Sequence, residues 1–251
     1  MAKTRKRPLV CSIGSTDPTA AAGIGLDLRV YAASGVDAAF AVAAVTAQNA
    51  AGVRGLVAIE PDLIAQQLQA IWEERPPDAL RIGLLPSSRA IGVVVAFLRA
   101  LKSRPPVVLD PVLAASSGTQ FSGPRELAAL RRLMPLATIV TPNAVEAQAL
   151  SGLRALTLDE ARKAAAALSE LGCAVLVKGG HLSERSAIDV LAIDGRFVKA
   201  YRSARLRRTR RGMGCLLAAA LAVELARGKK LDPAIATARA FVRAAPRSSY
   251  L

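Results

Sequence analysis

A glycine-rich turn near the end of the chain has the composition of an anion-binding site. Gly212, Met213, Gly214 and Cys215 stand between a run of arginines and the apolar stretch 216–225. Two glycines let backbone amides converge on an anion, and the helix predicted after them adds its positive N-terminal end. Cys215 falls at the start of that helix, where the pKa of a thiol is lowered. The alternative is a plain turn in which Cys215 packs as a small apolar side chain.

Two polar side chains in the first fifth of the chain suit a small polar ligand. Asp27 follows a loop of small residues, 14–25, and lies in the first turns of a predicted helix, where its carboxylate can accept hydrogen bonds. Gln48 follows another apolar run, and its amide offers two donors and an acceptor, which fits the edge of a heterocycle. Either feature is also consistent with an ordinary capping acid or strand end.

Acidic and basic side chains follow three further apolar runs. Asp110 ends one run, and Glu146 lies in the predicted first helical turn after another. One or two carboxylates together with substrate phosphates are ligands that Mg²⁺ uses, so this pair is a candidate magnesium site. The alternative for Glu146 is helix capping, because acids stabilise helix N-termini. Lys178, which two glycines follow, can reach a phosphate that the backbone also approaches.

Short apolar runs that alternate with helical stretches position these residues. The alternation predicts a mostly parallel sheet covered by helices on both faces, and Asp194-Gly195 predicts a late antiparallel hairpin. In such sheets ligands bind beyond the carboxyl ends of the strands, where the residues above are found. The predicted strands are 9–14, 38–45, 80–84, 107–110, 138–140, 174–178, 188–193 and 196–201, and the predicted helices are 24–34, 61–74, 88–102, 124–133, 145–150, 158–171, 216–226 and 233–244.

The composition indicates one α/β domain with a basic surface. The 251 residues are 52% hydrophobic but only 4% aromatic, and their net charge is +15. The arginines are spread along the chain and no nucleic-acid-binding motif is present, so no specific nucleic acid is expected. We expect a single domain over residues 1–251, with a basic, flexible stretch at 1–7.

Cysteine usage and hydropathy indicate the compartment. The three cysteines are widely spaced and form neither a disulfide framework nor a Cys-x-x-Cys pair. The apolar stretch behind the basic first residues is too short for a secretory signal, and no run approaches the roughly 18–20 apolar residues of a membrane span. We expect a cytoplasmic protein without a membrane segment.

In their order along the chain, these motifs resemble the hydroxymethylpyrimidine/phosphomethylpyrimidine kinases of the ribokinase-like superfamily. The resemblance covers nearly the whole chain. It implies a three-layer α/β/α fold and the phosphorylation, by ATP with Mg²⁺, of 4-amino-5-hydroxymethyl-2-methylpyrimidine, its monophosphate or both, in thiamine biosynthesis. The motifs that carry it are 14–18, 22–24, Asp27, 46–49, 81–85, 109–112, 141–143, Glu146, 177–181 and 214–215.

The resemblance also implies a role for each candidate residue. Cys215 takes the proton of the alcohol, beside an anion hole formed by Gly212, Met213 and Gly214. The further implied residues are Asp27, Gln48, Ala22 and Gly23 for the pyrimidine, Asn143, Lys178 and Arg211 for ATP, and Asp110 and Glu146 for Mg²⁺.

Several residues depart from the family's pattern. Ala20 and Ala21 stand where the family has two glycines, and Gly25 stands where it has glutamine. Since alanine is costly at positive φ, we expect this loop to be rebuilt. Met213 lacks the hydroxyl of the family's threonine, and Arg211 replaces a histidine with a fixed positive charge.

Two alternative functions accompany this hypothesis. A pyridoxal-type kinase of the same superfamily acts on a ring that also bears a hydroxymethyl group. The departures from the pattern also suit a regulator that binds a pyrimidine phosphate without turning it over. The resemblance allows a homodimer.

Overall fold

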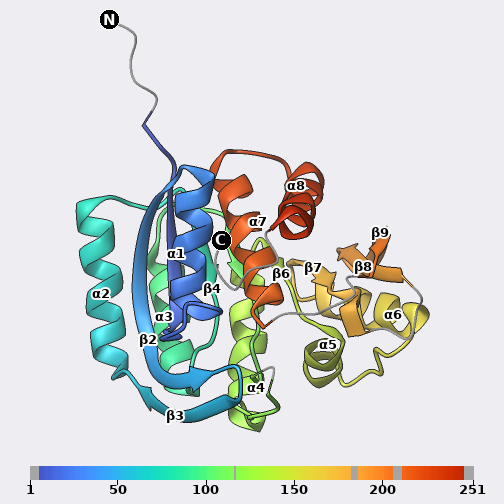
Figure 1. The fold of residues 1–251 in the computed structure, drawn as a ribbon, viewed down its shortest axis with the longest axis horizontal. Coiled ribbons are helices and arrows are strands. Elements are labelled where there is room, and N and C mark those ends of the chain that lie inside the picture. The colour runs from blue at the N-terminus through green and yellow to red at the C-terminus, as the bar shows by residue number, and fades with distance from the viewer. Residues whose placement is uncertain (1–5, 116, 182–185, 206–210, 246–251) are drawn as a thin grey trace, which may run out of the picture.

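A computed structural model describes residues 6–115, 117–181, 186–205 and 211–245, and nine strands of this part form one sheet (Figure 1). Its order is β3-β2-β1-β4-β5-β6-β7-β8-β9. Of the basic stretch 1–7, only Lys6 and Arg7 lie within the described residues. The strands are β1 (Leu9–Ser15), β2 (Asp37–Asn49), β3 (Gly52–Ala58), β4 (Ala79–Ile82), β5 (Val107–Leu109), β6 (Ile139–Val140), β7 (Ala174–Val177), β8 (Ser186–Ile193) and β9 (Arg196–Ala204).

Strand direction confirms the predicted fold class. β2, β1, β4, β5, β6 and β7 run parallel to one another, and β8 and β9 add the predicted antiparallel hairpin. The other edge was not predicted: β2 continues to Asn49, and β3 pairs with it antiparallel. Most of β3 is exposed and includes Arg54 and Gly55, so it has no apolar run that marks a strand. Backbone pairing with β2 holds it in the sheet.

Helices cover both faces of the sheet and complete a three-layer arrangement (Figure 1). Buried side chains form one core cluster between the sheet and α2 to α6, and a second between the sheet and α1, α7 and α8. Two 3₁₀ turns, η1 (Met134–Leu136) and η2 (Gly179–His181), complete the elements of the described residues. The helices are α1 (Gly23–Ser34), α2 (Pro61–Glu74), α3 (Ser88–Ala100), α4 (Pro124–Leu133), α5 (Ala144–Ser151), α6 (Leu158–Ser169), α7 (Met213–Ala226) and α8 (Leu231–Ala244).

Helix α7 has an unusual environment because it is apolar on every side except at Glu224, near its end, which pairs with Arg227 and Lys229. Residues 216–225 are all buried, against the sheet on one side and α1 and α8 on the others. A helix that is apolar all round is stable only in such a core position. No helix in the described ranges is long and apolar enough to cross a bilayer.

The parallel register brings the candidate residues to one edge of the sheet. Ile82 pairs with Leu109, and Leu109 with Val140, so the segments after β4, β5 and β6 leave the sheet side by side. Backbone hydrogen bonds continue the alignment beyond the strands: the Asp110 amide donates to the Ile82 carbonyl at 2.8 Å, and the Lys178 amide to the Pro142 carbonyl at 2.8 Å. Residues distant in sequence therefore meet at the carboxyl ends of the strands.

Candidate active site

The turn before α7 has the conformation that its glycines predict. Gly212 adopts a left-handed conformation with φ 83°, and its carbonyl accepts the first hydrogen bond of α7, from Leu216, at 2.8 Å. A Cβ on Gly212 would lie 2.0 Å from the carbonyl oxygen of Ala21. The start of α7 thus packs against the β1–α1 loop, and its first amides have no partner within the helix.

Cys215 is half-buried in the first turn of α7. Burial raises the pKa of its thiol to about 11; the Arg81 guanidinium and a hydrogen bond from the Gly23 amide act against this rise, whereas Asp110 and Asp27 add to it. The predicted lowering of this pKa is therefore wrong, because desolvation outweighs the favourable charges. Cys215 carries its proton at neutral pH in this structure.

A chain of buried charged side chains crosses the carboxyl ends of the strands. The Arg81 guanidinium lies between two carboxylates, with Nη1 3.3 Å from Oδ2 of Asp27 and Nη2 2.8 Å from Oδ2 of Asp110. The other oxygen of Asp110 accepts a hydrogen bond from Nζ of Lys178 at 2.8 Å. Oε2 of Glu146 lies 3.9 Å from the same nitrogen. The five groups form a continuous row in which negative and positive charges alternate.

Burial and pairing give the three carboxylates of this row different pKa values. Burial raises the pKa of Asp27 to about 6 although Arg81 opposes the rise. It also raises the pKa of Glu146 to about 7, against the effect of Lys178. Burial acts on Asp110 too, but Lys178 and Arg81 outweigh it and hold the pKa of Asp110 below its usual value. Asp110 is thus the strongest acid of the row, whereas Asp27 and Glu146 take up protons as the pH falls through the neutral and slightly acidic range.

Lys178 lies against the glycine turn that is predicted to hold a phosphate. A Cβ on Gly214 would lie 2.8 Å from Nζ of Lys178 and 3.9 Å from Oδ1 of Asp110. The structure therefore brings together the predicted anion hole, one predicted ATP residue and one predicted metal residue. The Lys178 ammonium and the N-terminal amides of α7 are both donors that an anion could accept, with Asp110 as the present partner of the ammonium.

Asn143 and Glu146 cap helix α5. The Asn143 side chain accepts a hydrogen bond from the Glu146 amide at 2.9 Å, and Oε2 of Glu146 accepts one from the Asn143 amide at 2.7 Å. The capping alternative for Glu146 is thus realised. It does not separate Glu146 from the site, because the same oxygen faces Lys178, and Asn143 pairs with Lys178 in a parallel bridge.

Of the residues predicted for the pyrimidine, Gly23 contacts Cys215. Ala22 precedes α1, and Gly23 begins it with φ 58° and donates its amide to the Cys215 thiol. A Cβ on Gly23 would lie 2.3 Å from the carbonyl oxygen of Ser15, so only glycine fits. Gln48 lies half-buried near the end of β2.

Asp27, predicted to bind the pyrimidine, has no exposed surface in this structure. Its Oδ2 accepts a hydrogen bond from the Ser12 hydroxyl at 2.8 Å and faces Arg81, and the Ser12 hydroxyl also pairs with that of Tyr31. The structure thus places Asp27 in a buried ion pair with Arg81 rather than on an open surface. This placement needs the tertiary structure, since a carboxylate at a helix start looks the same in sequence whether it faces a ligand or a buried guanidinium.

The β1–α1 loop, which we expected to be rebuilt because alanine is costly at positive φ, holds Ala20 at positive φ. Ala20 has a left-handed conformation, with φ 51°. Gly25 faces it: a Cβ on Gly25 would lie 3.1 Å from both Cα and Cβ of Ala20. The absence of a side chain at Gly25 therefore accommodates the methyl group of Ala20, and the loop keeps a conformation that glycine would adopt with less strain.

Two charged residues of the site were missed as functional residues in the sequence. Arg81 and Asp17 belong to the motifs named above but were given no role. Arg81 is 1% exposed although it lies in the middle of the buried strand β4. A lone arginine within an apolar strand is the signal that could have identified it, because an unpaired buried charge is not stable. Asp17 forms an ion pair with Arg211, with 2.7 Å between its Oδ2 and Nη2.

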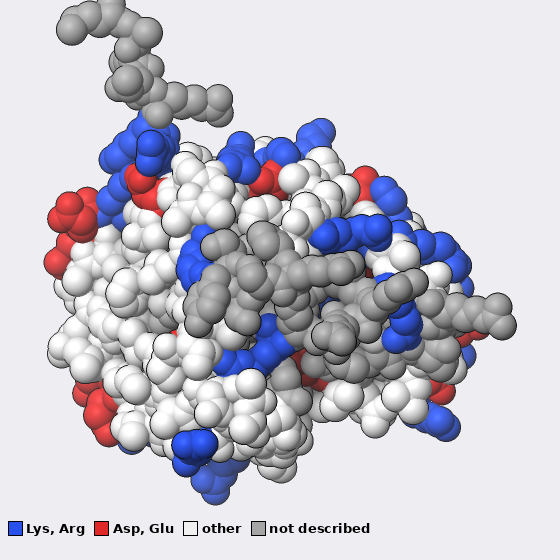
Figure 2. All heavy atoms as spheres, in the orientation of Figure 1, with Lys and Arg blue, Asp and Glu red and all other residues white. Residues whose placement is uncertain are grey.

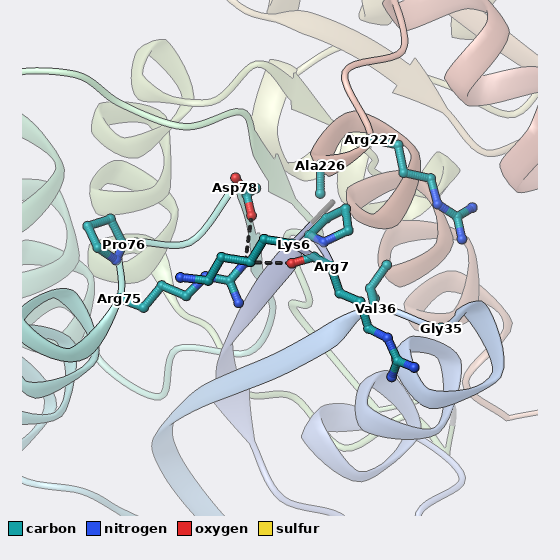
Figure 3. A pocket seen from close by; sticks show the side chains of 10 residues that line it. Lys6, Arg7, Gly35, Val36, Arg75, Pro76, Asp78, Ala226 and Arg227 are labelled. Atoms are coloured by element: carbon teal, nitrogen blue, oxygen red, sulfur yellow. Dashed lines mark hydrogen bonds and ion pairs between the residues drawn. The ribbon is translucent and has the colours of Figure 1, made fainter. Parts of the chain in front are cut away.

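A hollow of about 850 Å³ lies at the opposite end of the sheet, near the amino end of β1 (Figure 3). It contains none of the predicted site residues. Arg75 spans it with hydrogen bonds to the Arg7 carbonyl and to Asp78. On the face shown in Figure 2, Lys and Arg side chains lie at several separate places among the described residues.

Comparison with known proteins identifies the family. The sequence profile of phosphomethylpyrimidine kinase matches residues 17–250. The chain belongs to the phosphomethylpyrimidine kinase family. The family predicted from the motifs is thereby confirmed, and with it the class of enzyme, a phosphotransferase. A hydroxymethylpyrimidine/phosphomethylpyrimidine kinase of Rhizobium meliloti is 38% identical over 242 residues, which are 94% of this chain and 90% of that protein.

Two further proteins are similar to this chain over nearly its whole length. The chloroplastic thiamine biosynthetic bifunctional enzyme of Arabidopsis thaliana is 40% identical over 243 residues, or 95% of this chain, but the chain spans only 46% of that enzyme's length. The ADP complex of Bacillus subtilis pyridoxal kinase has a TM-score of 0.85 at 30% identity, covering 98% of this chain and 96% of that one.

Arg81→Met is expected to destabilise this kinase by about 3–5 kcal/mol, because it leaves two buried carboxylates without their shared cation. Arg154→Met is the control: it removes an arginine that is 76% exposed and 3.4 Å from Glu160, and should leave the free energy of unfolding nearly unchanged. Urea denaturation measures both. Equal stability of the two variants would refute the structural role of the buried row.

Gly212→Ala and Gly228→Ala separate backbone strain from collision. Both glycines have φ near 80°, but a Cβ on Gly228 meets nothing within 4 Å. Gly228→Ala should therefore lose only the about 1–2 kcal/mol of a left-handed alanine. Gly212→Ala should lose about 1–3 kcal/mol more through overpacking against Ala21, measured by denaturation. If the two variants lost the same stability, the close approach of the two loops would be disproved.

Ala20→Gly is expected to stabilise the protein by about 0.5–1 kcal/mol, because the relief of left-handed strain exceeds the added entropy of the unfolded chain. Ala21→Gly is the matched control. Ala21 is not at positive φ, so that variant should lose stability. Thermal denaturation of both variants tests the pair, and a loss of stability in Ala20→Gly would contradict the strain.

Proposed function

We propose that this kinase transfers a phosphoryl group from ATP to 4-amino-5-hydroxymethyl-2-methylpyrimidine, to its monophosphate, or to both. The observation that carries the proposal is the meeting of Cys215, the Gly212–Gly214 turn and the Lys178–Asp110 pair at one point of the sheet edge. A proton acceptor, a cradle of backbone amides and a cation are the parts that phosphoryl transfer to an alcohol requires.

The amide cradle stabilises the charge that develops on the transferring group. The first amides of α7 point away from the helix without intrahelical partners, and Nζ of Lys178 lies beside Gly214. Such donors are fixed by the fold before reaction, so little reorganisation opposes their action. Lys178 faces Asp110 and Asn143, and we propose that Lys178 and Asn143 contact the ATP phosphates.

Cys215 accepts the proton of the substrate hydroxyl in this mechanism. Its thiol is protonated in the present structure, so it first releases that proton to solvent as the substrates bind. The Arg81 guanidinium and the Gly23 amide favour the thiolate and provide for that step. The resulting thiolate then takes the proton of the alcohol. Gln48, Ala22 and Gly23 hold the ring, with the Gln48 amide at its polar edge.

Asp110 and Glu146 would hold Mg²⁺, which supplies charge neutralisation on the ATP phosphates. The donor set fits, since Mg²⁺ commonly uses one or two carboxylates and completes its shell with water and phosphate oxygens. Among the described residues no group of three or more His, Cys, Asp or Glu side chains is placed to hold a metal alone, which agrees with a site completed by substrate. Both Asp110 oxygens are already hydrogen-bonded, so water-mediated binding is the simplest arrangement.

A pyridoxal-type activity is the second candidate, favoured by the close structural likeness to B. subtilis pyridoxal kinase.

Two further proposals concern where this protein is located and how it assembles. We propose a cytoplasmic protein, in line with its three unpaired cysteines, and a homodimer. Phe40 and Val45 of β2 and Val57 of the edge strand β3 are exposed apolar side chains that a second copy could cover.

Cys215→Ala is expected to lower kcat for the pyrimidine alcohol by about 10²–10⁴-fold, the usual contribution of a positioned base. ATP consumption is measured with the pyrimidine and with pyridoxal, and the larger kcat/KM identifies the substrate. Cys173→Ala, which removes a buried thiol at the opposite end of the sheet, is the control and should keep its rate. Wild-type turnover by Cys215→Ala would refute the base role, and binding without turnover in the wild type would favour the regulator.

A further inference from the structure

Arg211 joins three segments that surround the alcohol side of the site. Its Nη2 lies 2.7 Å from Oδ2 of Asp17 and also donates to the hydroxyl of Thr19. Its Nη1 donates to the carbonyl oxygen of Asn49 at 2.5 Å. One guanidinium thereby connects the turn before α7, the loop after β1 and the end of β2.

The Arg211–Asp17 pair is shielded from water. The Asp17 side chain has no exposed surface, and that of Arg211 is 19% exposed. The other Asp17 oxygen accepts hydrogen bonds at 2.9 Å from the amide and the hydroxyl of Thr19. If Arg211 turned toward another anion, it would leave a buried carboxylate oxygen without its cation, which is costly. The positive charge of Arg211 is thus balanced by the carboxylate of Asp17.

Each of the three segments carries a residue of the proposed site. The loop that holds Asp17 continues into Ala22 and Gly23, and Asn49 directly follows Gln48. Arg211 directly precedes Gly212, whose Cα packs against the Ala21 carbonyl. The hydrogen bonds of Arg211 therefore fix the ring-holding residues relative to the turn that leads to Cys215.

We propose that Arg211 is a positioning residue for the alcohol substrate and not a ligand of ATP. This inference rests on the proposed function and replaces the ATP contact expected for Arg211 from the sequence. Both ends of the guanidinium fork are needed, because one nitrogen serves Asp17 and the other serves Asn49. A lysine has a single nitrogen at the end of its chain and cannot serve both at this geometry.

The experiment compares four variants: Arg211→Met, Arg211→Lys, Asp17→Asn and the double variant Arg211→Met with Asp17→Asn. Arg132→Met is the control, because it removes the same charge from an exposed position on α4. Steady-state kinetics gives KM for the pyrimidine alcohol and for ATP at low and high salt. Calorimetry gives Kd for ADP and for the alcohol separately, and thermal denaturation follows the fold.

Arg211→Met is expected to raise KM and Kd for the alcohol by about tenfold, the equivalent of about 1.4 kcal/mol, and to leave KM for ATP and Kd for ADP within twofold. Arg211→Lys should recover only part of this loss. Asp17→Asn should reproduce the loss, and the double variant should be no worse than the more affected single variant, since both remove one interaction.

A rise in Kd for ADP that salt abolishes, with the alcohol unaffected, would show that Arg211 binds nucleotide and would overturn the inference. Lower thermal stability with both ligands bound normally would also overturn it, because the residue would then be only structural. The binding measurements separate this inference from the proposed function. If the wild type binds the alcohol without turnover, the kinase proposal is contradicted. The Kd for the alcohol in the Arg211 variants still shows whether Arg211 affects alcohol binding.

Discussion

The candidate site depends on one buried cation, Arg81. Its guanidinium lies in the interior between Asp27 and Asp110, and through Asp110 it reaches Lys178 at the α7 turn. A buried arginine is tolerated only when carboxylates balance it, and buried carboxylates stay ionised only beside such a cation. The members of the row therefore require one another. This mutual requirement fixes side chains from α1, β4 and the loops after β5 and β7 in one arrangement, which is the precision that a phosphoryl-transfer site needs.

Backbone contacts add a second constraint. Gly212 lies so close to the Ala21 carbonyl, and Gly23 to that of Ser15, that neither position accepts a Cβ. These contacts bring the N-terminal ends of α1 and α7 together on one side of the sheet, with the Gly23 amide on the Cys215 thiol. The ion pair of Arg211 with Asp17 acts at the rim of the same junction. The junction where we propose that the alcohol binds is thus held by close backbone contacts inside and by an ion pair at its rim.

Much of the fold follows from sequence pattern. The strands after which Asp110 and Lys178 stand are continuous apolar runs, and their parallel pairing follows from the helices between them. Strand β3 was missed because its side chains are mostly exposed and only its pairing with β2 defines it. Ala20 shows the opposite failure. A local rule treats alanine at positive φ as costly, but the space left by Gly25 accommodates Ala20 in that conformation.

The sequence by itself determined the fold class, because apolar periodicity is a local property of the chain, and the family, through the resemblance of its motifs in their order. It also pointed to the turn that we propose binds an anion. Only the tertiary structure decided the protonation states of the titratable groups and the ion-pair partners of the charged ones. Burial raises the pKa of Cys215 although its place at a helix start predicted the reverse, and Arg211 pairs with Asp17, 194 positions away in sequence. Solvation and ion pairing depend on what lies within a few ångströms in space, and sequence order does not contain that information.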